Sequence, residues 1–249
     1  MTDPTELSTT NWKEVLFGRD SFFPVLFLAI LTILLSPMID EFHFGFLIVY
    51  PVSALMVLLA FHSSRVSKRT MTTVSVLLVI VGVMSVITSI ARIVDFTDDR
   101  YLIAVSAALF AVLIACAFPV VVRRAFQHER VTLNTLAAGI TAYLLIGIFF
   151  SSLYRCDSAL QHFQIFHETL HPNAGDYTYF SFITLTTVGF GDLTPATEFA
   201  RSLSIFEAIL GQVFLVTAVA RIVSLLGSQK PDTSRIPSGH DFSNDKDAD

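Results

Sequence analysis

Apolar residues along this chain form long runs that are separated by short polar stretches. Five of these runs contain no Lys, Arg, Asp or Glu, and each has about the 20 residues that a helix needs to cross ~30 Å of hydrocarbon. A backbone inside a bilayer must satisfy its own hydrogen bonds, so each run is predicted to be a transmembrane helix. Pro24, Pro37 and Pro51 are expected to kink the first two helices without abolishing them. The five runs are residues 21–39, 42–62, 71–91, 101–122 and 131–153.

A sixth run, residues 199–226, also has the length of a spanning helix. It carries Arg201, Glu207 and Arg221, so part of its surface is expected to face protein or water. Before it lie a polar loop, residues 154–176, and a short aromatic run, residues 177–186, which is predicted to be a re-entrant half-helix. The predicted fold is therefore an all-α membrane protein with six transmembrane helices and a re-entrant helix between the fifth and the sixth.

The composition agrees with a membrane protein. Of the 249 residues, 53% are hydrophobic and 15% are charged, which is too apolar for an ordinary soluble domain. The net charge of −5 comes without a polybasic block, so no nucleic-acid partner is expected.

Acidic residues in the first 20 positions argue against a cleaved secretion signal. Cys116 and Cys156 fit neither a disulfide framework nor a metal site, and we assign them no role.

The distribution of basic residues predicts the orientation, because Lys and Arg in short loops are retained in the cytoplasm. Six crossings put both termini on one side, together with twelve of the 16 basic residues. We therefore expect a multi-pass protein of the cell (inner or plasma) membrane with both termini cytoplasmic. Only four basic residues fall on the other side: Arg92, Arg100, Arg155 and Arg201.

Residues 186–192 read Thr-Thr-Val-Gly-Phe-Gly-Asp and follow the predicted half-helix. An ion leaves water only if other oxygens replace its hydration shell, and a ring of backbone carbonyls from four chains does so for potassium. Consecutive carbonyls face one axis only if the backbone alternates in handedness. Gly189 and Gly191 can adopt positive φ without steric cost, and the Thr187 hydroxyl can add an oxygen below them. The alternative is a Gly-rich turn between two helices.

These residues resemble the potassium-channel signature Thr-Val-Gly-Tyr/Phe-Gly, and the resemblance runs from about residue 177 to 226. It implies a homotetramer in a lipid bilayer, with K⁺ as the permeating ion and no cofactor. It also implies a selectivity filter whose carbonyls at Thr187, Val188, Gly189 and Phe190 bind K⁺, with Gly191 completing the strand and Thr186 and Asp192 supporting it and forming its mouth. Many relatives place a Trp near Phe180, and some a Glu near Ile183, to hold the filter through this Asp. Neither is present here, and Phe190 lacks the hydroxyl of the commoner Tyr.

The last helix carries the remaining candidate site residues. The resemblance makes Gly211 a hinge of the inner helix, whereas close helix packing is its alternative role. Glu207, one turn earlier, is expected to hold the pore helix through Thr184 or Thr186 or through a neighbouring subunit, rather than to touch permeating ions. One face is expected to line the ion cavity, unless it packs on the fifth helix; it comprises Gln212, Leu215 and Val219, with Val223 near the cytoplasmic end.

The charged residues of the predicted helices and loops bear on how the channel would be gated. Residues 101–122 contain no charge, and one charge gains only about 2.3 kcal/mol per 100 mV, so steep voltage dependence is not expected. Arg92 is expected to pair with Asp95. The outer-loop residues His162, His167, Glu168 and His171 could sense protons or bind zinc, although a solvated loop is the simpler interpretation. Asp95, Asp98 and Asp99 are expected to form a solvated face.

We therefore expect four parts: a cytoplasmic N-terminal segment (1–20), a four-helix peripheral domain (21–130), a pore domain (131–226) and a disordered cytoplasmic tail (227–249). The expected function is passive, K⁺-selective conduction. A potassium transporter with degenerate filters would need four pore repeats in one chain, and this chain has one. A non-conducting regulatory subunit would not need an intact filter. No nucleophile, base or metal cluster within the predicted spans suggests an enzyme.

Overall fold

The structure is a computed structural model that describes residues 21–41, 45–64, 66–94, 100–126, 132–161 and 164–228. The predicted N-terminal segment and nearly all of the predicted tail lie outside these residues. Every regular element within the described ranges is a helix, as predicted. The helices are α2 (Phe23–Leu35), α3 (Met38–Glu41), α4 (Gly45–Ser63), α5 (Lys68–Ile93), α6 (Arg100–Phe126), α7 (Leu133–Leu160), α8 (Ala174–Leu185) and α9 (Glu198–Ser228).

Four helices, α5, α6, α7 and α9, are long and apolar enough to cross a membrane by length and composition. The apolar part of α4, Ile48–Ser63, and the whole of α2 are shorter. At 1.5 Å per residue, the 13 residues of α2 span only about 20 Å. The structure thus supports a helical membrane protein, and the count of six spans stays a prediction.

The first predicted helix, residues 21–39, is broken rather than kinked. Helix α2 ends at Leu35, and α3 begins only after Pro37, because proline lacks the N–H of the helical ladder and disfavours a helical residue before it. Ser36 closes the end of α2, since both its backbone N–H and its hydroxyl donate to the Ile33 carbonyl. Pro24 lies in the first turn of α2, where its missing N–H costs nothing, so the kink predicted there is wrong.

Helix α7 is longer than predicted at its C-terminal end. It begins after Thr132, whose hydroxyl accepts the Thr135 backbone N–H at 3.2 Å, and continues to Leu160 rather than ending at Leu153. The predicted end was placed where the apolar run gives way to polar residues. A helix of 28 residues is about 42 Å long and reaches beyond the ~30 Å apolar layer, where such residues are tolerated. Tyr154 and Arg155, which were expected in a loop, are therefore helical.

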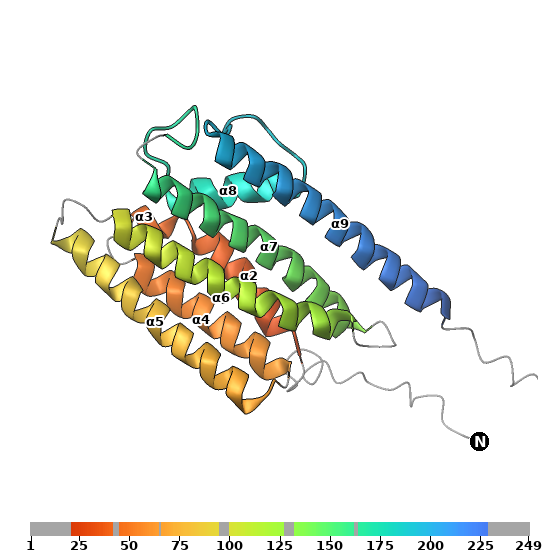
Figure 1. The fold of residues 1–249 in the computed structure, drawn as a ribbon. Coiled ribbons are helices and arrows are strands. Elements are labelled where there is room, and N and C mark those ends of the chain that lie inside the picture. The colour runs from red at the N-terminus through yellow and green to blue at the C-terminus, as the bar shows by residue number, and fades with distance from the viewer. Residues whose placement is uncertain are drawn as a thin grey trace, which may run out of the picture.

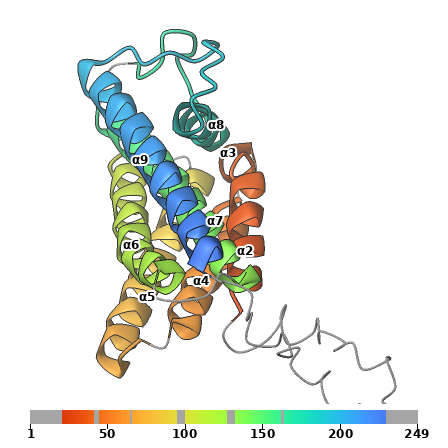
Figure 2. The ribbon, with the colours of Figure 1, turned by 90° about the vertical axis from the view of Figure 1, so that its right-hand side faces the viewer.

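Helix α7 lies at the centre of the molecule. It packs against α2, α6, α8 and α9, and Figure 1 shows α4 and α5 on one side of it and α9 on the other. The short helix α8 crosses one end of the bundle and appears almost end-on in Figure 2. Because α8 contacts both α7 and α9, the segment that follows it is supported by two long helices.

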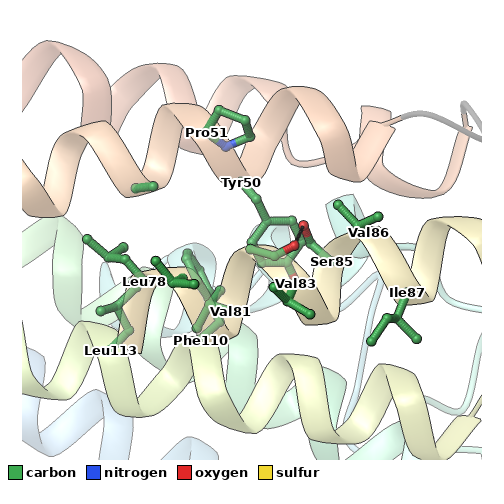
Figure 3. A pocket seen from close by; sticks show the side chains of 13 residues that line it. Tyr50, Pro51, Leu78, Val81, Val83, Ser85, Val86, Ile87, Phe110 and Leu113 are labelled. Carbon is green, nitrogen blue, oxygen red and sulfur yellow. Dashed lines mark hydrogen bonds between the residues drawn. The ribbon is translucent and has the colours of Figure 1, made fainter. Parts of the chain in front are cut away.

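The peripheral helices are more loosely packed. Helices α4, α5 and α6 line a half-open pocket of about 550 Å³ that is apolar except for Tyr50 and Ser85. Figure 3 shows these two side chains beside Val83 and Phe110. Only 28% of the apolar stretch of α5 is buried, compared with 61% for α7. The closely packed part of the chain is thus the part around α7 that positions the predicted filter.

Candidate ion-conduction site

Helix α8 corresponds to the predicted re-entrant helix, residues 177–186, but starts three residues earlier. Its start is fixed by a capping box, in which the Asn173 side chain accepts the Asp176 N–H at 3.0 Å and the Asp176 carboxylate accepts the Asn173 N–H at 2.8 Å. Such reciprocal bonds satisfy backbone donors that have no partner within the helix. The helix ends at Leu185, directly before the signature residues.

The backbone of the signature alternates in handedness. Gly189 and Gly191 have φ values of +51° and +80°, as predicted, and Thr187 has φ of +58°. Val188 and Phe190 between them do not have positive φ. A left-handed conformation is rare for a β-branched residue such as Thr187, so the surrounding structure must hold it. This alternation over five residues is the backbone form in which successive carbonyls can face one axis.

Hydrogen bonds from the filter strand return to the end of α8. The Thr187 N–H donates to the Thr184 carbonyl at 3.0 Å, and those of Val188 and Gly189 donate to the Ile183 carbonyl at 2.9 and 3.1 Å. Within the described residues, no hydrogen bond uses the carbonyls of residues 187–190. The N–H groups of Thr187, Val188 and Gly189 are therefore satisfied by the end of α8, and the carbonyl oxygens of these exposed residues remain available for a ligand.

Tyr179 supports the outer end of this strand and was missed by the sequence analysis. Its hydroxyl donates to Asp192 Oδ2 at 2.7 Å, so Asp192 has a side-chain donor although the Trp and Glu of relatives are absent at Phe180 and Ile183. Phe180 instead packs its ring 5.0 Å from Tyr154 and 4.9 Å from Phe166, between centroids. A tyrosine one position from the usual Trp is the signal that could have identified this contact.

If the chain conducts K⁺ as its sequence predicts, substituting Tyr179 with phenylalanine is expected to make the selective current decay faster during sustained recording. The change removes the hydroxyl that holds Asp192 and leaves the ring in place. Macroscopic current in planar bilayers measures the decay. Tyr177→Phe is the matched control, because the Tyr177 hydroxyl on the same helix bonds to Ser158 at 2.7 Å and not to the filter. Equal decay in the two variants would contradict a role for Tyr179.

The outer loop is attached to the segment that follows the filter. The His167 N–H donates to the Thr194 carbonyl at 3.1 Å, and the Ala196 N–H donates to the Ile165 carbonyl at 2.8 Å. Glu168 accepts both the N–H and the hydroxyl of Thr194, at 2.8 and 2.6 Å. The loop is solvated at Glu168, as expected, because this residue is exposed, and its carboxylate also holds the segment that follows Asp192.

The histidines of this loop do not share a helical face, because His167 and His171 lie in irregular backbone. No group of three or more His, Cys, Asp or Glu side chains in the described residues could hold a metal ion. His162 lies outside the described residues, as do Asp95, Asp98 and Asp99 of the other outer loop and the proposed pairing of Arg92 with Asp95. The predicted sensing roles thus gain no support from the described part of the loop.

The stability that Glu168 provides is expected to depend on pH. The hydroxyl of Thr194, and then its backbone N–H, lower the pKa of Glu168 below its ordinary value of 4.5. A lowered folded-state pKa stabilises the fold above the ordinary pKa, and the contribution is lost as the pH falls through the folded value. Thermal unfolding should therefore separate wild type from Glu168→Gln at pH 7, with a difference that shrinks below about pH 4.5. A difference that grows in acid would contradict this assignment.

One face of helix α9 packs against other helices of the chain, and the opposite face is exposed. Ala200, Glu207 and Gly211 are buried, and Phe214 stacks on Tyr143 of α7 with 6.2 Å between ring centroids. The predicted cavity-lining residues lie on the other side and are exposed, so this face does not pack on α7 within one chain. They are Gln212, Leu215, Val219 and Val223.

Gly211 and Glu207 both contact the support of the filter. A Cβ atom on Gly211 would lie 2.5 Å from Leu185 Cδ1 and 3.0 Å from the Leu185 carbonyl oxygen, so α9 and the end of α8 are in close contact there. The Leu185 carbonyl also accepts the Tyr143 hydroxyl at 3.0 Å. Glu207 does bond to α8, but through Ser181; the partners expected from the sequence, Thr184 and Thr186, are wrong.

Comparison with known proteins gives one match. Residues 138–228 match a family model described as an ion channel, and these 91 of 249 residues cover most of α7, all of α8 and the filter, and α9. No curated protein and no solved structure gave a match. The match, with the long apolar helices, supports an ion channel in a membrane and points away from an enzyme.

Proposed function

We propose that this chain is one subunit of a K⁺-selective channel that conducts passively across the membrane. The observation that carries the proposal is the row of unpaired carbonyls at residues 187–190, in a strand whose φ alternates in sign. Carbonyl oxygens in rings can replace the hydration shell of K⁺. The ion-channel match covers the whole of this strand, which supports the same interpretation.

A homotetramer follows from the incompleteness of the single chain. One strand supplies one quarter of each oxygen ring. In one chain, Val188 is 53% and Phe190 is 72% exposed, and only 11% of the apolar stretch of α9 is buried. An apolar helix with this much open surface requires lipid or protein against it. Three further copies around the filter axis would cover the exposed residues of the strand and place Gln212, Leu215 and Val219 around a central cavity.

The remaining features of the proposal concern gating and topology. Arginines of α6 lie only in its first and last turns, at Arg100, Arg123 and Arg124, so this helix offers few charges for the membrane field to move. We therefore propose a channel without steep voltage dependence. The excess of Lys and Arg on the side of the termini supports cytoplasmic N- and C-terminal segments in the cell membrane. The four-part division of the chain is retained as part of this proposal.

Flux through purified protein in liposomes tests the function. Vesicles loaded with K⁺ should release it down its gradient when the protein is present, and vesicles loaded with Na⁺ should not. Equal release of the two ions, or no release over a range of voltage, pH and Ca²⁺, would overturn the proposal. Recording over the same three variables would also identify the gating stimulus. Cross-linking in detergent, with four subunits as the expected limit, tests the tetramer.

A further inference from the structure

A sealed polar cluster lies where α7, α8 and α9 meet. Glu207, Tyr154 and Ser181 each have 0% of their surface exposed. Tyr154 donates its hydroxyl proton towards Glu207 Oε2 at 2.8 Å. The Ser181 hydroxyl lies in hydrogen-bond contact with Glu207 Oε1 and, at 2.8 Å, with the carbonyl oxygen of Gly147. One carboxyl group therefore connects the outer, pore and inner helices.

In the part of the chain that the structure describes, no cation compensates this carboxyl group, because no Lys, Arg or His there lies within 4.0 Å of Glu207. The titratable side chains described around it are Tyr154 and Tyr143, both from α7. Helix α8 contributes the Ser181 hydroxyl, and the Ser204 hydroxyl of α9 contacts Tyr154 at 3.2 Å. An unpaired charge buried among apolar helices is costly.

The protons available in the cluster determine its charge. Ser181 has one proton but two neighbours, and the Gly147 carbonyl can only accept. If Glu207 were ionised, the Ser181 hydroxyl could satisfy the carbonyl or the carboxylate but not both. If Oε1 carries a proton, Glu207 donates to Ser181, Ser181 donates to Gly147, and Tyr154 donates to Oε2. Ser204 donates its own proton to the Ala200 carbonyl at 2.8 Å, so towards the Tyr154 hydroxyl, 3.2 Å away, it can only accept, and it supplies no proton to the carboxyl group. Only the protonated form of Glu207 lets Ser181 bond to both the Gly147 carbonyl and the carboxyl group while Tyr154 donates to Oε2.

We propose that Glu207 is an uncharged carboxylic acid that positions the filter by linking α9, α8 and α7 through a directed chain of hydrogen bonds. The chain reaches the filter by a short path, because Ser181 lies two residues before Ile183, whose carbonyl accepts the N–H groups of Val188 and Gly189. Glu207 is therefore a positioning residue with no contact to the ion. Its role in the filter rests on the proposed function, whereas its protonation state does not.

Infrared spectroscopy tests the proton directly. Purified protein at neutral pH should show the C=O stretching band of a protonated carboxyl group, shifted by exchange into D₂O, and this band should be absent from Glu207→Gln. Glu198→Gln is the matched control on the same helix, because Glu198 is exposed and pairs with Arg201 at 3.0 Å; it should keep the band. A wild-type spectrum that does not differ from Glu207→Gln in this region would overturn the proposal.

Liposome flux tests the positioning role. Glu207→Gln keeps a neutral donor and an acceptor, so its K⁺ flux should stay within about twofold of wild type, whereas Glu207→Ala and Ser181→Ala should lower it by about tenfold or more. If Glu207→Gln loses as much flux as Glu207→Ala, a charged Glu207 is required and the proposal fails. If wild type shows no selective flux, the proposed function and the filter role fail together, while the infrared band still decides the protonation state.

Discussion

On the proposed function, replacing Gly189 with alanine is expected to abolish K⁺-selective flux and leave the proposed tetramer assembled. Gly189 has φ of +51°, a conformation that costs an L-residue roughly 1–2 kcal/mol. The penalty recurs in each of four subunits around one axis. A single chain has open space for the new Cβ, with no atom within 4 Å, so the substitution should act on the filter backbone and not on the packing of the subunit. Liposome flux of K⁺ and Na⁺ measures the effect.

Gly139→Ala provides the matched control for this experiment. Gly139 lies in α7, its φ is not positive, and an added Cβ would also meet no atom within 4 Å. This variant should conduct like wild type. Cross-linking and gel filtration should show the same assembly for both variants. Unchanged selectivity in Gly189→Ala would refute the assignment of residues 187–190 as the ion-binding strand.

The backbone conformation of the site could be predicted from the sequence because glycine adopts positive φ without steric cost. Gly189 and Gly191, spaced by two, indicated an alternating strand, and both positive φ values are present. Thr187 could not be assigned in this way, since a β-branched residue gives no sign that it will adopt φ of +58°. Its conformation depends on hydrogen bonds to the end of α8, which are properties of the folded chain.

The support of the filter could not be predicted from motif positions. The resemblance to potassium channels points to donors for Asp192 near Phe180 and Ile183, and neither position carries one. The donor is Tyr179, because a hydroxyl at the end of a long ring can reach a site that the neighbouring position on the helix cannot. Similarly, Glu207 was recognised as a support, but its partners Ser181 and Tyr154 follow from the relative rotation of three helices.

The boundaries of the spans show the limit of a hydropathy pattern. It gave the correct type for every described helix, because runs of apolar residues at bilayer depth must be helical. It placed the end of α7 at Leu153, where polarity rises, although the helix continues to Leu160. The extra turns carry Tyr154, and with it the contact to Glu207. The error in the boundary and the missed partner therefore have the same cause.

The sequence left two roles open for Gly211, a hinge of α9 and a close contact between helices. A flexible hinge and a close helix contact both favour glycine. The structure supplies the contact, since a Cβ at this position would lie 2.5 Å from Leu185 Cδ1, and Leu185 is only 1% exposed. Leu185 is the last residue of α8, directly before Thr186 and the filter. A larger side chain at position 211 would therefore displace Leu185 and with it the end of the pore helix.

Gly211→Ala is expected to destabilise the assembled protein by about 1–3 kcal/mol, the usual cost of overpacking a filled contact. A hinge without this contact predicts the opposite sign, because alanine favours a helix over glycine by about 1 kcal/mol. Thermal unfolding of the purified tetramer distinguishes the two signs, and Gly139→Ala again serves as the control.

A second substitution tests the contact itself. Leu185→Ala alone should be destabilising, by about 2–5 kcal/mol for a large-to-small change in a buried position. Combined with Gly211→Ala it should cost less than the sum of the two single changes, because the space vacated by Leu185 accepts the new methyl group. A coupling free energy of 0.5 kcal/mol or more in that direction is of the size expected for residues in contact. Strict additivity would show that Gly211 acts through the flexibility of α9 and not through the end of the pore helix.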